Sequence, residues 1–160
     1  MDPRFISPFI QSVQNVFSTM LQLPVSVGEP RLKEGARGSH DVSGIIGMSG
    51  DVVGCVVLSL SSATAQRIVA LFTGHQTPPE SDDFADAIGE LVNMISGGAK
   101  ANFPRGAVSI SAPSVVMGAG HTIARQREVP CVIIPCATDC GDLVIEIAIQ
   151  AHSSPAAAAA

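Results

Sequence analysis

The sequence predicts a single α+β domain that is built from two similar halves. Its 160 residues suffice for one domain with its own core. Helical and alternating apolar patterns predict a helix, three strands and a short helix, followed by a second helix and three more strands. The third strand of each half opens on a related run, GDVV at 50–53 and GDLV at 141–144. We therefore expect two pseudo-repeats in one domain over residues 1–152, with two long helices and about six strands.

The first half is predicted to hold a helix, three strands and a short helix. The Leu23-Pro24 pair should stop the first helix, because the residue before a proline is disfavoured in helical geometry. The tight-turn run SGD joins the second and third strands as a hairpin, and Ser61 or Ser62 can cap the short helix. The helix is expected at 8–21, the strands at 25–31, 42–48 and 52–60, and the short helix through Phe72 with Gly74 ending it.

The second half is predicted to begin with a long helix that Ser81 caps, after a linker marked by Pro78-Pro79. Asp82 and Asp83 fall in its first turn, where the helix dipole favours acidic side chains. This helix is expected to end near 104–106, with strands at 108–117 (broken at Pro113), 129–137 and 143–149, and a disordered tail at 153–160.

Composition excludes several classes of protein. With 46% hydrophobic and 14% charged residues, the chain can bury a core and is not disordered. A net charge of -5, few aromatic residues and no basic run offer little to nucleic acid. The N-terminus lacks the pattern of a signal peptide, and no run approaches the ~20 apolar residues that span a bilayer. We therefore expect a cytoplasmic protein without a nucleic-acid or membrane partner.

The most informative segment is the long helix of the second half, where Glu90 and Asn93 lie three residues apart and so share a helix face. Asn93 and the glycines Gly89, Gly97 and Gly98 together lower the propensity of this segment to form a helix by roughly 3 kcal/mol. A cluster of residues that are individually unfavourable in a helix indicates a functional site. The structural alternative is a solvated Asn and glycines that admit a neighbouring helix. The polar stripe holds Asp86, Glu90, Asn93, Gly97 and Lys100, and the apolar stripe holds Phe84, Ile88, Leu91, Ile95 and Ala99.

Cysteine and histidine offer weaker alternatives. The spacing of Cys131, Cys136 and Cys140 matches no common zinc pattern, and in a strand Cys131 and Cys136 point to opposite faces. Together with Cys55, they are interpreted as small hydrophobic residues in a reducing compartment, with a thiol or metal site as the distant alternative. The histidines lie apart in predicted loops and the tail and are expected to be solvated; they are His40, His75, His121 and His152.

Aligning the two halves pairs their long helices. Asn15 then matches Asn93, and Ser12 falls at the position of Glu90. Only the second half would carry the Glu-x-x-Asn pair.

Four blocks of sequence, in order, resemble the CheX phosphatases of bacterial chemotaxis, which belong to the CheC/CheX/FliY family. The similarity covers roughly residues 5–149. The blocks are NVFSTM at 15–20, DVSGIIGMSGD at 41–51, GELVNMI at 89–95 with Gly97 and AK at 99–100, and VP at 129–130 leading to GD at 141–142.

The resemblance implies a hydrolase that removes the aspartyl phosphate of a CheY-like response regulator. It implies that Glu90 pairs with a lysine beside the phosphate and that Asn93 orients the attacking water. The regulator already holds Mg²⁺, so this chain would need no cofactor of its own and would supply only a positioned amide. Ser12 places the chain with relatives that use one such site, and Asn15 is then left to packing or capping.

The resemblance also implies a CheC-like fold, with two long helices on an antiparallel sheet, and a homodimer formed at a sheet edge. An exposed long edge strand would give that dimer a physical basis. A non-catalytic module that binds a receiver domain or a flagellar component is the alternative function.

Overall fold

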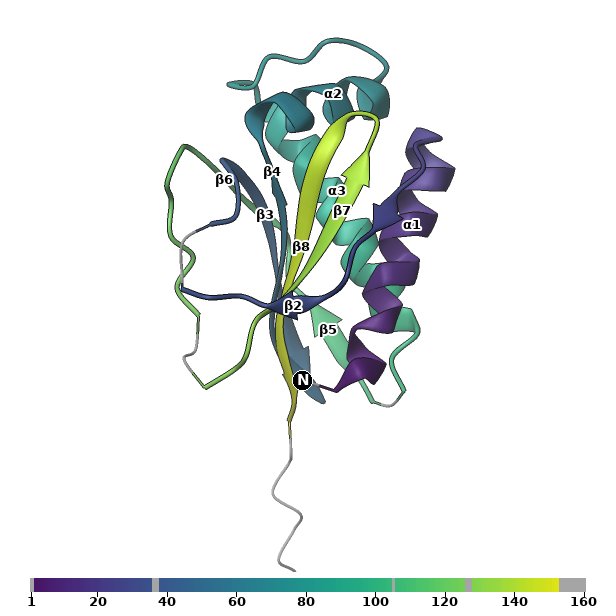
Figure 1. The fold of residues 1–160 in the computed structure, drawn as a ribbon, viewed down its shortest axis with the longest axis vertical. Helices are drawn as coiled ribbons and strands as arrows, with labels where there is room; N and C mark the ends of the chain where they lie inside the picture. Colours follow the sequence, from purple (N-terminus) through teal and green to yellow (C-terminus); the bar gives the residue numbers. More distant parts are fainter. Residues whose placement is uncertain (1, 36–37, 105, 126–127, 153–160) are drawn as a thin grey trace, which may run out of the picture.

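The computed structural model describes residues 2–35, 38–104, 106–125 and 128–152, and the tail expected at 153–160 lies outside them. Figure 1 shows two long helices along one side of a sheet and a shorter helix across its end. The helical elements are η1 (Pro3–Phe5), α1 (Ser7–Leu21), α2 (Ser62–Thr73) and α3 (Asp82–Ala101). The strands are β1 (Ser26–Val27), β2 (Arg31–Leu32), β3 (Val42–Gly50), β4 (Val52–Leu60), β5 (Val108–Ile110), β6 (Ser114–Met117), β7 (Val132–Thr138) and β8 (Gly141–Ala151).

The helix boundaries follow the predicted caps. Ser61 accepts a hydrogen bond from the Thr64 backbone N–H at the start of α2, and Ser81 accepts one from Phe84 at the start of α3. Gly74 ends α2 in the left-handed conformation, which a glycine adopts without strain. The α+β fold and these caps are confirmed.

The sheet is antiparallel, and its strand order exchanges the first strands of the two halves. The order is β1-β7-β8-β4-β3-β5, with β2 on β7 and β6 on β3. The third strands, β4 and β8, pair at the centre. The first strands of one half therefore lie against the hairpin of the other half, as a duplication with exchanged edges would produce.

Some strand predictions were too long. The segment predicted as one strand at 25–31 forms only the two-residue strands β1 and β2, since Gly28 and Pro30 lie between them and proline cannot donate to a sheet. The break at Pro113 is confirmed, because it separates β5 from β6. The strand predicted from Val129 begins at Val132, beyond Pro130.

The core lies between α1, α3 and one face of the sheet. The apolar stripe predicted on α3 is almost fully buried there, and alternate residues of β8 from Leu143 to Ile149 complete it. Segments 33–41 and 118–131, in their described parts, run along the opposite face of the sheet (Figure 1). The backbone N–H of Gly38 donates to the carbonyl of His121 and joins these two segments.

Candidate functional site

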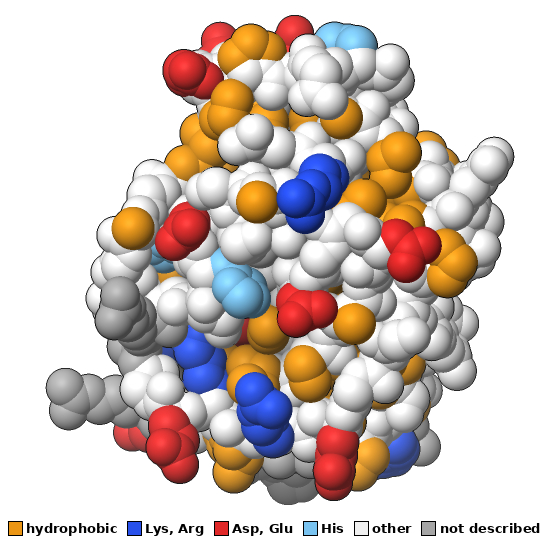
Figure 2. All heavy atoms as spheres, turned by 45° about the horizontal axis from the view of Figure 1, so that its top comes forward, with side chains coloured by type: hydrophobic (Ala, Val, Ile, Leu, Met, Phe, Trp, Pro, Cys, Tyr) orange, Lys and Arg blue, Asp and Glu red, His pale blue; other side chains and the backbone are white. Residues whose placement is uncertain are grey.

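The polar stripe of α3 faces outward. Asp86, Glu90 and Lys100 are exposed, whereas Asn93 and Gly97 are half-buried. The two stripes predicted from helical spacing are therefore confirmed as a buried face and an accessible face. Figure 2 shows one face of the molecule, on which acidic and basic side chains are interspersed among apolar and neutral ones.

Glu90 borders a hollow of about 400 Å³ between α3 and the edge of the sheet. Pro113 and Val115 form the wall of the hollow opposite the helix, and Asp86 lies one turn before Glu90. None of the ion pairs within the described part of the chain involves Glu90. Its carboxylate is thus free to meet a cation of another molecule.

Asn93 lies one turn further along the same face of α3. Near the end of the helix, the Asn102 amide donates to the Gly98 carbonyl at 3.0 Å, so that amide is used within the fold. The Asn93 amide has no such bond to another described residue. A half-buried amide with both donor and acceptor capacity can orient a water molecule without changing its own protonation.

The glycines of α3 have different surroundings. A Cβ at Gly98 would lie 2.4 Å from the Ser12 Oγ, and a Cβ at Gly89 would lie 3.1 Å from Pro113. Gly89 and Gly98 therefore have a structural role, because the lack of a side chain lets neighbouring elements of this chain pack closely against α3. Gly97 has nothing within 4 Å of its Cβ position and stays open to a partner.

Ser12 does not lie in a second copy of the site. It is buried in the contact between α1 and α3, and its hydroxyl donates to the Ile95 carbonyl at 2.7 Å. Asn15 is exposed on α1. The position that aligns with Glu90 thus serves helix packing in the first half.

The cysteines are distributed over both faces of the sheet, as the strand geometry predicted. Cys136 belongs to the main core, and burial raises its pKa to about 12, so the thiol stays protonated. Burial likewise raises the pKa of Cys55 and Cys131 on the opposite face. Among the described residues, no three His, Cys, Asp or Glu side chains come together as metal ligands would.

The expectation that all histidines are solvated was wrong for His121. Its Nε2 lies 2.8 Å from the Ser43 Oγ, and its Nδ1 lies 2.8 Å from the Gly118 carbonyl oxygen. The ring thereby fixes the segment after β6 onto β3. His75 and His152 are exposed, and His40 is half-buried.

Sequence reasoning missed a buried ion cluster, formed by Lys33, Arg125 and Glu146, on the side of the sheet away from α1 and α3. Glu146 contacts both cations, and the Ser39 hydroxyl donates to its Oε1 at 2.6 Å. Burial acts to raise the pKa of Glu146, but the bonds from Lys33 and Ser39 and the charge of Arg125 outweigh it and lower the pKa. The position of Glu146 between Val144 and Ala148 on an otherwise apolar strand was the available signal.

The comparisons with known proteins agree with the fold. Residues 42–137 match the family model described as chemotaxis phosphatase CheX. The CheY-P phosphatase CheX of Thermotoga maritima is 31% identical over 121 residues, which span 74% of this chain and 78% of the relative. No helix in the described ranges is long and apolar enough to cross a bilayer.

Solved structures show the same architecture. A CheC-like superfamily protein from Shewanella sp. PV-4 superposes with a TM-score of 0.82 at 33% identity, covering 94% of this chain and 99% of the other. CheX in a CheX-CheY-BeF3-Mg²⁺ complex from Borrelia burgdorferi gives a TM-score of 0.72 at 20% identity, covering 91% and 97%. Given its fold, its Glu-x-x-Asn helix and these matches, the chain belongs to the CheX family of chemotaxis phosphatases.

Proposed function

We propose that this protein hydrolyses the aspartyl phosphate of a CheY-like receiver domain and that Glu90 and Asn93 engage that domain. The observation that carries the proposal is the unpaired Glu90–Asn93 face of α3 in a chain that is 31% identical to a CheY-P phosphatase. The bound partner in the Borrelia burgdorferi complex is CheY, with Mg²⁺ present. Chemotaxis signalling, in the cytoplasm, is accordingly the proposed setting.

The chemistry requires little from this chain. An acyl phosphate is reactive toward water, so a partner accelerates hydrolysis chiefly by positioning that water and excluding other geometries. Asn93 would accept a hydrogen bond from the water through its amide oxygen. Glu90 would pair with a lysine of the receiver, and Mg²⁺ would remain a ligand of the receiver.

The surroundings of the two residues fit a protein substrate. Glu90 stands at the rim of an open hollow, and the bare Gly97 surface lies one turn beyond Asn93. A receiver could therefore approach the helix closely along this side. Asp86 and Lys100 extend the same stripe and would flank the contact.

The test pairs rate with binding for Asn93→Ala and Glu90→Ala. Asn93→Ala should lower phosphate release from the phosphorylated receiver by about 10²-fold or more while the receiver still binds. Glu90→Ala should also weaken binding, by ~2 to 5 kcal/mol, because it leaves the receiver's lysine unpaired. Phosphate release and receiver titrations on the same preparations measure both effects.

Asn15→Ala on α1 is the matched control, since Asn15 aligns with Asn93 but is exposed without an acidic neighbour in its motif. It should retain activity. Full activity in a folded Asn93→Ala protein would refute the catalytic assignment. Receiver binding without any acceleration by the unmodified protein would favour the non-catalytic module.

A homodimer is proposed as the functional assembly. Among the described residues no long strand lies at a sheet edge, because the edges consist of β1, β2, β5 and β6, which are two to four residues long. β6 nevertheless supports the proposal, since Val116 and Met117 are large apolar side chains exposed on it.

A further inference from the structure

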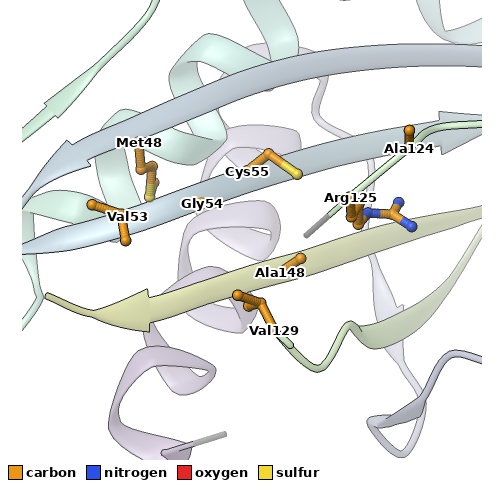
Figure 3. A pocket seen from close by; sticks show the side chains of 8 residues that line it. All are labelled: Met48, Val53, Gly54, Cys55, Ala124, Arg125, Val129 and Ala148. Carbon is orange, nitrogen blue, oxygen red and sulfur yellow. The ribbon is translucent and has the colours of Figure 1, made fainter. Parts of the chain in front are cut away.

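A second hollow, of about 350 Å³, lies on the face of the sheet that α1 and α3 leave uncovered. β4 and β8 form its floor, and Ala124, Arg125 and Val129 form one side (Figure 3). Its volume is within the range of small-molecule sites in proteins. It shares no lining residue with the hollow beside Glu90, so it is separate from the proposed phosphatase site.

Arg125 lines this hollow and is not fully satisfied by the fold. Its side chain is only 9% exposed, and its Nη2 donates to the Glu146 carboxylate. Its Nε is buried and has no hydrogen-bond partner in the described part of the chain. Buried N–H groups are nearly always paired, so this donor indicates an acceptor that the described residues do not supply.

The charges around Arg125 point to the sign of that acceptor. Lys33 and Arg125 both contact the single carboxylate of Glu146, and all three side chains are more than nine-tenths buried. This cluster of described residues therefore carries one more positive than negative charge. An uncompensated buried charge is unfavourable, and one bound negative charge would balance it.

The rest of the hollow is apolar. Figure 3 shows Arg125 toward one end, Met48 and Val53 at the other, and Cys55 across from Ala148 in the middle. A molecule that fills this space would have a charged head at Arg125 and a hydrocarbon tail toward Met48. A planar carboxylate suits a guanidinium better than a compact or doubly charged anion in such surroundings.

We propose that this hollow binds a small monocarboxylate with a short apolar tail, whose head pairs with the Arg125 side chain that lines the hollow. The site needs no metal and no covalent step. It is independent of phosphate hydrolysis, so either assignment can fail without the other.

The first test uses the unmodified protein and three probes that differ only in their head group: hexanoate, 1-hexanol and hexylamine. Methyl NMR titrations should show hexanoate shifting the signals of Val53, Val129 and Ala148. Its affinity should exceed that of 1-hexanol by about tenfold or more, and hexylamine should bind least. Equal affinities for the three probes, or no shift with hexanoate, would overturn the proposal.

Two variants and a control locate the site. Arg125→Gln should abolish the preference for hexanoate over 1-hexanol, and Ala148→Leu should weaken both probes by filling the hollow. Arg31→Gln, which removes an exposed cation from β2, should leave binding unchanged. Thermal melts check that each variant folds. If a folded Arg125→Gln or Ala148→Leu protein binds hexanoate as well as the parent does, the proposed site is wrong. If either variant fails to fold, the comparison of the three probes on the unmodified protein remains the test.

Discussion

The role of a polar side chain in this protein depends on whether other residues of the fold form hydrogen bonds or ion pairs with it. Glu90 and Asn93 are polar and lack partners among the described residues, so they are available to another molecule. Glu146 has the same side chain as Glu90 but lies in the opposite situation, because its side chain is fully buried and held by Lys33, Arg125 and Ser39. The same residue type therefore serves recognition at one position and stability at the other.

The contrast between the two glutamates predicts different stabilities for matched substitutions. At pH 7, Glu146→Gln should lower the free energy of unfolding by ~3 to 5 kcal/mol, because it leaves buried cations without their carboxylate. Glu90→Gln, at an exposed position, should change it by no more than about 0.5 kcal/mol. Urea unfolding of the two variants beside the parent measures both values, and similar losses would contradict the cluster's role.

The same carboxylate predicts a pH dependence. The pKa of Glu146 is lower in the folded protein than its ordinary value, so its contribution to stability is present above the pKa of the unfolded chain, about 4.3. That contribution is lost as the pH falls through the folded pKa. Melting temperatures of the parent should thus fall more steeply below about pH 4.3 than those of Glu146→Gln. Parallel curves for the two proteins would show that Glu146 does not titrate with folding.

At the scale of elements, the sequence predicted helices better than strands. Periodicity and capping residues located α2 and the start of α3 closely, because Ser61, Gly74 and Ser81 act through local hydrogen bonds and backbone geometry; the end of α3, expected near 104–106, lies at Ala101. Pro30 could have predicted the separation of β1 and β2, but their two-residue lengths could not be predicted, since each depends on pairing with the distant β7. The exposed stripe of α3 was predictable from spacing, but the different neighbours of Gly89, Gly97 and Gly98 were not, because they belong to other elements.

The contact between α1 and α3 predicts a non-additive pair of substitutions. Gly98→Ala should destabilise the protein, because its Cβ would meet the Ser12 Oγ at 2.4 Å. Adding Ser12→Ala removes that oxygen, so the double variant should be more stable than the sum of the single changes implies, by 0.5 kcal/mol or more, on the order of measured couplings between contacting residues.

Gly97→Ala is the matched control for this pair. It meets no atom within 4 Å and should raise stability by up to about 1 kcal/mol through helix propensity. Chemical denaturation of the four variants measures these differences. Additive effects of Gly98→Ala and Ser12→Ala would show that the two positions do not touch in solution.

For the whole molecule, the exchanged sheet edges place β6 at the periphery and the longest pairing, that of β4 with β8, at the centre. We expect the protein to sediment as a homodimer at micromolar concentration through the β6 edge. Val116→Lys should shift it toward the monomer, because a charge on an exposed edge strand opposes pairing with another strand. Leu71→Lys, at an exposed apolar position on α2, is the control and should leave the mass unchanged. If the parent protein sediments as a monomer, the proposed homodimer is wrong.

The exchanged edges also determine when the chain can fold. β1 pairs with β7, and β4 pairs with β8, so strands from early in the chain wait for partners near its end. During synthesis, the first half can form its hairpin and helices on the ribosome but lacks the central partner of β4. Pairings between such distant segments slow folding, because a long loop must close before the contacts form. Nascent chains of this protein should therefore depend on release of the C-terminal strand from the ribosome to become resistant to protease.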